Sequence, residues 1–287
     1  MAQGLKDIRR RIASVKNIRK ITSAMKMVAA AKLRRAQEQV QAGRPYAEAI
    51  RGVLGRLAKD AGGSHPFLVE RPVQNTLAIV VTSDRGLAGA YNANLNRAGT
   101  RLLREVSGPR VIAVGRKARD YFRRRQVAIA AEFTGLGDQP RFADAERIGK
   151  EATRLYLSGE CDRVHLVYAR YINAITCRPV AMQLLPITGA DLAGAGDGAA
   201  AGEYIFEPDA EEVLAHLLPH YVSVLIYRSL LEAKASEFGA RMAAMDNATQ
   251  NAGEVIDRLT LVSFRMRQAA ITKEIAEIVG GANALQG

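Results

Sequence analysis

The first sixty residues carry a regular stripe of apolar side chains with charged side chains between them. The stripe advances by three or four residues at a time, through Leu5, Ile8, Ile12, Val15, Ile18, Ile21, Met25 and Val28. This spacing predicts an amphipathic helix with coiled-coil character from about Leu5 to Lys59. Pro45 interrupts the pattern, so we expect either a kink or two successive helices there. A helix of about 40–55 residues would be roughly 60–80 Å long.

A second long helix is predicted near the other end of the chain, from about Asp209 to Val279. Its seam has spacings of three and four and is rich in small and flexible residues: Leu231, Ala235, Phe238, Met242, Met245, Thr249, Ala252, Ile256, Leu259, Ser263, Met266, Ala270 and Lys273. Pro219 lies near the start, where a helix tolerates proline best, and Gly280 and Gly281 end the pattern. Because a compact domain does not need two such helices, we expect them to pair as a long antiparallel coiled coil.

Between these helices, from about Asn75 to Thr188, apolar runs alternate with amphipathic segments. Strands are predicted at 76–82, 110–114, 127–131, 163–171 and 176–185, and helices at 90–106, 117–125 and 144–157. The run TLAIVVT at 76–82 is continuously apolar, as expected of a parallel strand buried on both faces. A short turn at Asn173–Ala174 joins the last two strands and predicts an antiparallel edge hairpin. The alternation predicts a Rossmann-like, three-layer α/β domain.

The predicted fold class is therefore α plus α/β, with the α/β domain inserted between two coiled-coil helices. We expect an N-terminal helix in residues 1–60, the α/β domain in 75–188, a linker in 189–208 and a C-terminal helix in 209–287. The linker is rich in Gly, Ala and Asp. No run of about 18 apolar residues occurs, so we expect no membrane span. The start, MAQGLKDIRRR, lacks the apolar core of a signal peptide.

The positive charge of the chain is concentrated at its N-terminal end. The net charge is +12, and residues 1–60 hold 15 Lys and Arg against 4 Asp and Glu, whereas residues 204–287 hold 7 against 11. Such an arm favours an acidic partner, which nucleic acid, anionic lipid or an acidic protein surface would each provide. A basic coiled-coil nucleic-acid-binding protein is therefore an alternative function. The charges, however, interleave with the apolar stripe instead of forming a separate basic region.

Residues that could carry chemistry are few and scattered. The turn at 83–89, SDRGLAG, links a predicted strand to a helix, but it lacks the G-x-G-x-x-G pattern and the Lys-Ser/Thr pair of phosphate-binding loops. We interpret it as a tight turn that needs glycine at an unusual φ. The histidines and candidate carboxylates show no catalytic or metal-ligand spacing: His65, His165, His216, His220, Asp84, Asp120 and Asp144. We expect no catalytic residue, cofactor or metal site.

Five segments carry a more specific resemblance. They are IASVKNIRKITSAMKMVAA at 12–30, RPY at 44–46, SDRGLAGAYN at 83–92, RQAAITKEI at 267–275 and IVGGA at 278–282. In these segments, from one end to the other, the chain resembles the gamma subunit of F-type ATP synthases.

The two cysteines, Cys161 and Cys177, lie in predicted strands and are expected to be free buried thiols. Gly189–Gly202 has no cysteine, unlike the plant chloroplast subunit, which argues against thiol regulation. The bacterial type is favoured because no transit peptide is evident.

The resemblance implies a role in torque transmission. In this family the terminal helices form a shaft inside a ring of three alpha and three beta subunits. The α/β domain and lower shaft rest on the membrane ring of c subunits, beside the epsilon subunit. Proton flow turns the c-ring and the shaft, while ATP is made on the beta subunits. For this chain the resemblance implies a peripheral location at the cytoplasmic face of the plasma membrane, with no active site.

The resemblance also implies which residues contact the beta subunit. Met25 matches a shaft position facing an acidic helix-turn-helix loop of beta, and Lys26 lies beside it, where relatives carry an acid. Arg241 matches a position tied to coupling between shaft and stator. The upper-shaft positions expected to bind a beta catch loop are Arg267, Gln268 and Thr272, with Glu274 in the same patch.

Overall fold

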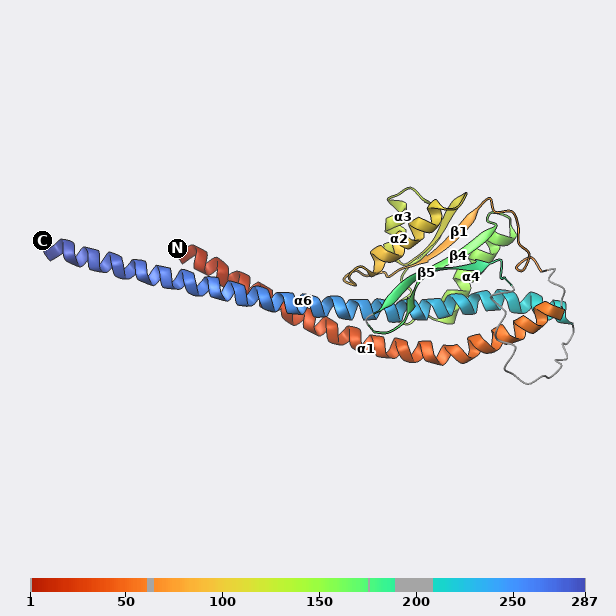
Figure 1. The fold of residues 1–287 in the computed structure, drawn as a ribbon, viewed down its shortest axis with the longest axis horizontal. Coiled ribbons are helices and arrows are strands. Elements are labelled where there is room, and N and C mark those ends of the chain that lie inside the picture. Colours follow the sequence, from red (N-terminus) through yellow and green to blue (C-terminus); the bar gives the residue numbers. More distant parts are fainter. Residues whose placement is uncertain (1, 61–64, 175, 189–208, 287) are drawn as a thin grey trace. The chain divides into compact units, whose positions relative to one another are not determined.

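The structure is a computed structural model that describes residues 2–60, 65–174, 176–188 and 209–286. The elements follow one another as α1 (Ala2–Asp60), β1 (Thr76–Val81), α2 (Tyr91–Arg104), β2 (Pro109–Val114), α3 (Arg116–Arg123), β3 (Ala128–Phe133), α4 (Phe142–Leu157), β4 (Arg163–Tyr171), β5 (Cys177–Leu185) and α6 (Ala210–Gln286) (Figure 1). The chain divides into two compact units: Met1–Val28 with Met242–Gly287, and Ala29–Arg241. The predicted linker at 189–208 lies outside the described residues.

The two long helices predicted from the apolar spacing are confirmed, with two differences. Helix α1 continues through Pro45 as one element, although proline removes the hydrogen bond to the carbonyl of Gln41. Helix α6 continues through Gly280 and Gly281 to Gln286. Glycine weakens a helix by about 1 kcal/mol relative to alanine and need not end it. At its start, the Asp209 side chain accepts a hydrogen bond from the Glu212 amide at 2.8 Å, which caps the helix.

The middle of the chain forms one five-stranded sheet with the order β3-β2-β1-β4-β5. The pairs β1–β2, β1–β4 and β2–β3 are parallel, and β4–β5 is antiparallel, which confirms the predicted edge hairpin. Strand β1 therefore lies at the point where the strand order reverses. In open α/β sheets, ligands bind outside the carboxyl ends of the strands at this point.

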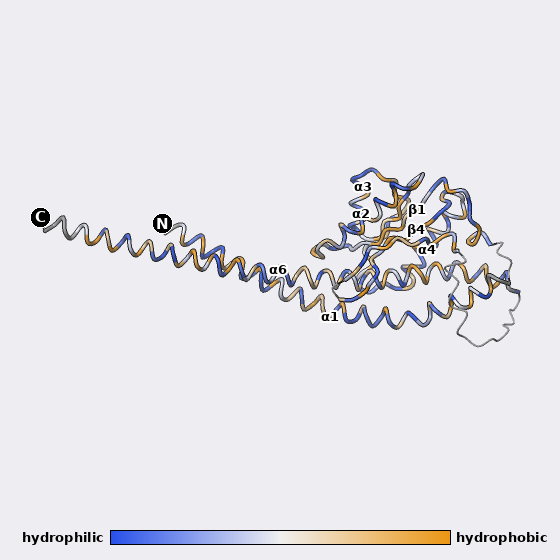
Figure 2. Tube along the Cα trace, in the orientation of Figure 1, coloured by the Kyte–Doolittle hydropathy of each residue, from blue (hydrophilic) through white to orange (hydrophobic). Residues whose placement is uncertain are grey.

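The alternation of side chains along each central strand separates two layers of core. One face of the sheet packs on α2 and α3, with Val80, Ala113 and Phe122 among its buried residues. The other face packs on α4 and on the parts of α1 and α6 that belong to this unit, where Ile79 and Leu54 are fully buried. The predicted three layers are present, but the two terminal helices supply much of the third (Figure 1). Hydrophobic colouring is concentrated on the strands (Figure 2).

Within each unit the terminal helices contact one another in antiparallel order. In the unit that contains both chain ends, Thr249 Oγ1 donates to Thr22 Oγ1 at 2.8 Å and Lys26 Nζ lies 2.7 Å from Asp246 Oδ1. Met266 Cε lies 2.9 Å from where a side chain on Gly4 would begin. In the other unit, Tyr46 Oη lies 2.8 Å from His220 Nε2. In that unit Gly43 also lies against Leu231, so within each unit the residue numbers fall along α6 as they rise along α1, and the two helices are antiparallel there.

Candidate functional site

The turn after β1 is a structural connection, as the sequence predicted. Gly89 has a φ of 55°, a conformation that glycine adopts without strain, and Leu87 also has a positive φ of 62°. Asp84 fixes the loops around this turn, because its carboxylate accepts hydrogen bonds from the amides of Arg116 and Gly135. Asp84, one of the three carboxylates considered in the sequence, is thus engaged by two backbone N–H groups.

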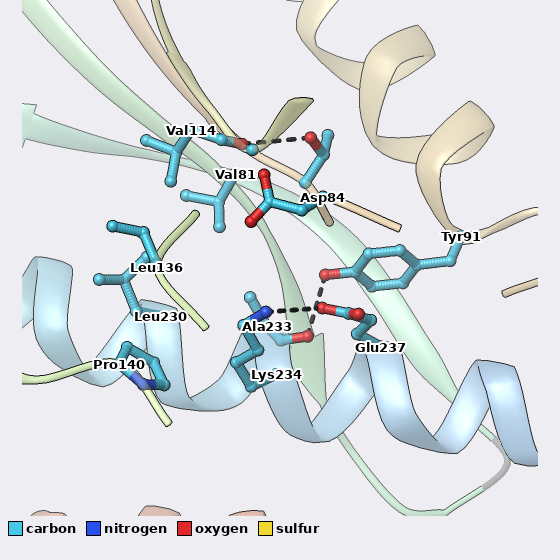
Figure 3. Close-up of a pocket in the computed structure, with 12 residues that line it drawn as sticks. Val81, Asp84, Tyr91, Val114, Leu136, Pro140, Leu230, Ala233, Lys234 and Glu237 are labelled. Atoms are coloured by element: carbon cyan, nitrogen blue, oxygen red, sulfur yellow. Dashed lines mark hydrogen bonds and ion pairs between the residues drawn. The ribbon is translucent and has the colours of Figure 1, made fainter. Parts of the chain in front are cut away.

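Helix α6 covers the strand ends where a ligand would bind in a nucleotide-binding relative of this fold. Tyr91 Oη donates to the carbonyl of Ala233 at 2.9 Å, and Ser236 Oγ donates to the carbonyl of Ala169 at 3.1 Å. A β-carbon on Gly239 would lie only 2.6 Å from the carbonyl oxygen of Ala174. Burial and the nearby Glu237 raise the pKa of Tyr91 well above its ordinary value. Figure 3 shows α6 lying across this site.

The space left beneath α6 is small. The cavity at the ends of β1 and β2 has a volume of about 20 Å³ and is lined by Val81, Asp84, Tyr91, Leu136, Lys234 and Glu237, among others (Figure 3). That volume accommodates about one water molecule. This cavity therefore has no room for a dinucleotide or nucleoside triphosphate, and a more open cavity of about 260 Å³ lies beside it, lined by Asp84, Arg116 and Asp138 among others.

Charged residues on α6 form specific contacts that attach this helix to the α/β domain. Glu237, with a 5% exposed side chain, pairs with Lys234 at 3.0 Å and with Arg241 at 2.8 Å. The Arg241 guanidinium also donates to the carbonyl of Gly86 in the turn after β1, at 3.3 Å. Helix α1 is held by Lys32, whose ammonium lies 2.7 Å from Asp138 and whose hydrogen bond lowers the pKa of that carboxyl. These contacts join both long helices to loops of the α/β domain.

The residues expected to contact a partner fall into three separate groups. Met25 is half-buried, and Lys26 is paired inside the chain with Asp246. Arg241 is in the buried ion-pair group described above, with a 12% exposed side chain. The last group is exposed on one stretch of α6: Arg267, Gln268, Thr272 and Glu274. The structure therefore brings the last four together on one helix and leaves Arg241 facing the α/β domain.

The same stretch of α6 carries an apolar surface that was not predicted from the sequence. Large hydrophobic side chains there are exposed: Leu261, Phe264, Ile271, Ile275, Ile278 and Val279. Orange and blue positions alternate along this part of the trace in Figure 2. Gly4 lies against Met266, so the described part of α1 does not extend along α6 much beyond that residue. Comparing the lengths of the two helices would have indicated this unpaired segment.

The remaining candidates have structural partners or surroundings. Asp144 caps the start of α4, and Asp120 pairs with Arg119. No cluster of metal-ligating side chains occurs among the described residues. Both cysteines are free thiols. Cys161 is buried but precedes β4, whereas Cys177 begins β5 and is only half-buried. The prediction that both are buried and lie in strands is therefore wrong in part. None of the described helices is long and apolar enough to cross a bilayer.

The fold and these contacts define a class of protein in which an α/β domain is fastened to two long antiparallel terminal helices and its strand-end crevice is closed by one of them. The ATP synthase family model matches residues 4–285. The ATP synthase gamma chain of Desulfitobacterium hafniense is 53% identical over 98% of this chain and 99% of its own length, and that of Desulforamulus reducens is 52% identical over the same shares. The chain belongs to the ATP synthase gamma chain family.

Solved structures agree with this assignment. The central stalk and c-ring structure of the Tetrahymena thermophila mitochondrial ATP synthase contains a chain that is 27% identical, with a TM-score of 0.61, over 79% of this chain and 99% of that one. A chain in the Euglena gracilis mitochondrial ATP synthase has a TM-score of 0.73 over 99% of this chain and 95% of that one, at 19% identity, and shows the same fold. The family assignment replaces the nucleic-acid-binding alternative.

Proposed function

We propose that this chain is the central-stalk rotor subunit of an F-type ATP synthase. It couples rotation of the c-ring to ATP synthesis and hydrolysis on the hexamer of alpha and beta subunits. The observation that carries the proposal is the match to gamma chains at about 50% identity along nearly the whole chain. The exposed apolar stretch of α6 supports it, because such a surface needs a partner to cover it.

The two terminal helices form the shaft of this rotor as an antiparallel coiled coil. The seam of small and flexible residues on α6 and the contacts Thr22–Thr249 and Lys26–Asp246 support that packing. In functional terms the chain divides into shaft helices at 1–60 and 209–287, an α/β domain at 75–188 and a linker at 189–208. The α/β domain and lower shaft bind the c-ring and the epsilon subunit. The complex holds the chain peripherally at the cytoplasmic face of the membrane.

The chain itself is non-catalytic in this account, and ATP chemistry takes place on the beta subunits. The contacts of α6 with the strand ends and the lack of a phosphate-binding lysine after Gly89 support this assignment. The isolated chain is therefore expected to hydrolyse no nucleotide and to bind ATP no better than at about millimolar Kd. Steady ATPase turnover by a contaminant-free preparation, lost on mutating one residue of this chain, would refute it.

Contact with the beta subunit is assigned to two regions of the shaft. Met25, with Lys26 beside it, faces the acidic loop of beta. Arg267, Gln268, Thr272 and Glu274 bind the catch loop of beta, and their exposure leaves them accessible to a partner. Arg241 contributes to coupling by fastening α6 to the turn after β1, since most of its side chain is already covered within this chain.

Co-purification from membranes tests the proposal most broadly. A tagged copy of the chain is extracted in mild detergent, and its partners are identified by mass spectrometry. We expect the alpha, beta, epsilon and c subunits to be recovered together. Recovery of nucleic acid or of an unrelated protein, with no ATP synthase subunit, would overturn the proposal.

A further inference from the structure

Three arginines that are far apart in the sequence line one cavity in the unit formed by Ala29–Arg241. Arg51 comes from α1, Arg170 from β4 and Arg228 from α6. The cavity has a volume of about 160 Å³. Its lining includes the polar side chains of Tyr168, Gln183 and Ser229. Arg51 is half-buried, while Arg170 and Arg228 are exposed, so the wall of the cavity carries three positive charges that a ligand from solvent can reach.

The carboxylates around the cavity compensate only part of this charge. Arg228 Nε donates to Glu232 Oε1 at 3.1 Å, and Glu232 is buried with a 6% exposed side chain. It is the only acidic side chain of the described residues that forms an ion pair with any of the three arginines. A hydrogen bond with Tyr168, and then the charge of Glu232, raise the pKa of Arg170. Arg51 Nε is buried and has no hydrogen-bond acceptor among the described residues.

We propose that this cavity is a binding site for a small tetrahedral oxyanion of the inorganic phosphate class. Guanidinium groups present planar donors that match phosphate oxygens, and hydroxyl and amide side chains complete such a site. Leu184 and Ile187 are buried in its lining and exclude water from one side, which strengthens electrostatic attraction. Sites for drug-sized ligands usually have at least about 300 Å³, so this cavity suits phosphate better than a nucleotide.

A bound anion would also have a mechanical consequence. It would join α1, β4 and α6 through one shared ligand, and these are the elements by which the long helices are attached to the sheet. The proposal does not depend on the rotor function, because all three arginines belong to one unit of this chain. We expect the anion to stabilise that unit by binding the folded state alone.

The test measures phosphate binding to the full-length chain at constant ionic strength, with chloride replacing phosphate in the reference. Isothermal titration and thermal unfolding against inorganic phosphate should give saturable binding, with a Kd of about 0.1–1 mM. Arg51→Gln and Arg170→Gln should each weaken binding about tenfold or more, because each removes a charged donor. Neither arginine has an ion-pair partner among the described carboxylates, and Glu232, whose charge acts on Arg170, keeps its ion pair with Arg228 in both variants.

Arg97→Gln is the matched control, since it removes the same charge from an exposed position on α2. It should leave phosphate binding unchanged. If either glutamine variant fails to fold, Arg51→Lys and Arg170→Lys take its place. They keep the positive charge but lose the planar guanidinium donors, so they should still weaken phosphate binding. Non-saturable binding, or equal binding by the cavity variants and Arg97→Gln, would overturn the proposal. Competition by ADP at a lower concentration than phosphate would also overturn it, because the site would then be one for nucleotides.

Discussion

Lys26 has a partner inside the chain, and this bears on the neighbouring position. Its ammonium lies 2.7 Å from Asp246, so its charge is balanced in part by α6. Met25 beside it is half-buried and uncharged. In the rotor account this surface faces an acidic loop of beta, so the strength of that contact depends on how much unbalanced positive charge the shaft presents.

Met25→Lys is therefore expected to weaken energy coupling more than assembly. The new cation would strengthen binding to the acidic beta loop by about 1 kcal/mol or more. This additional contact with the beta loop would have to be broken at each step of rotation. ATP hydrolysis and ATP-driven proton pumping are compared in the same membranes, with Met25→Leu as the uncharged control. Proportional loss of both activities, or no change in either, would count against the idea.

The cysteines allow a chemical test of burial. Desolvation raises the pKa of Cys161 to about 12 and also raises that of Cys177, whose side chain is less buried. Only the thiolate reacts with disulfide reagents, and a raised pKa lowers its fraction at a given pH. At pH 8 Cys161 should react at least about tenfold more slowly than Cys177.

Single-cysteine chains made by Cys161→Ala and Cys177→Ala measure each rate separately. Raising the pH should speed both reactions, and denaturant should make the two rates similar. Faster labelling of Cys161 than of Cys177 in the folded chain would show that the region before β4 is open.

At the scale of elements, the attachment of α6 to the β4–β5 hairpin depends on a helical glycine. A β-carbon at Gly239 would lie 2.6 Å from the backbone oxygen of Ala174, whereas one at Gly253 would have no heavy atom of another group within 4 Å. Alanine favours a helix interior over glycine by about 1 kcal/mol. Gly253→Ala should therefore stabilise its unit by about that amount, while Gly239→Ala should destabilise the other unit.

Urea unfolding of the two variants, followed by circular dichroism and by hydrogen exchange in each unit, provides the measurement. Each variant serves as the control for the other, since both replace a glycine inside the same helix with alanine. Stabilisation of similar size by the two substitutions would contradict the close contact at Gly239.

Most elements could be predicted because their signals are local. The three- and four-residue spacing predicts both long helices, and the apolar runs predict the strands to within a few residues. The break expected at Pro45 and the helix end expected at Gly280 were wrong, because a helix can continue through a residue that disfavours it when the neighbours on both sides favour it. The three layers were predicted, but not that α1 and α6 supply much of the third, since this depends on apolar residues such as Leu54 packing on a sheet encoded elsewhere in the chain.

The candidate sites show the same limit. The segment 267–275 could be singled out because its residues are consecutive. The pair Lys26–Asp246 and the cavity lined by Arg51, Arg170 and Arg228 join residues that are far apart in sequence. No periodicity within one segment reports such contacts, so they became visible only in the folded chain.

At the scale of the whole molecule, the upper part of α6 is where the account expects the hexamer to bind. Gln268 and Thr272 are one helical turn apart, share a face and are both exposed. Leaving a partner group of beta unpaired costs about 1–3 kcal/mol. The double substitution Gln268→Ala with Thr272→Ala should therefore lower ATPase activity and loosen the shaft in the ring of alpha and beta subunits.

The same double variant should keep its epsilon subunit and c-ring, because those partners are assigned to the α/β domain and lower shaft. Stability of the ring complex and retention of epsilon are measured on one preparation, with Glu254→Gln, an exposed position on α6 before that stretch, as the control. Suppose instead that the variant loses epsilon while the hexamer of alpha and beta subunits stays bound and active. The end of the shaft that carries Gln268 and Thr272 would then lie at epsilon and not inside the hexamer.

Observing rotation of single complexes is the decisive experiment for the rotor function. The chain is assembled with its alpha and beta subunits on a surface, and a particle is attached to Arg124→Cys at the exposed end of α3, in a Cys177→Ser background. Adding ATP should turn the particle in one direction, and removing ATP should stop it. A hexamer that hydrolyses ATP at its full rate while the firmly attached particle stays still would contradict the account.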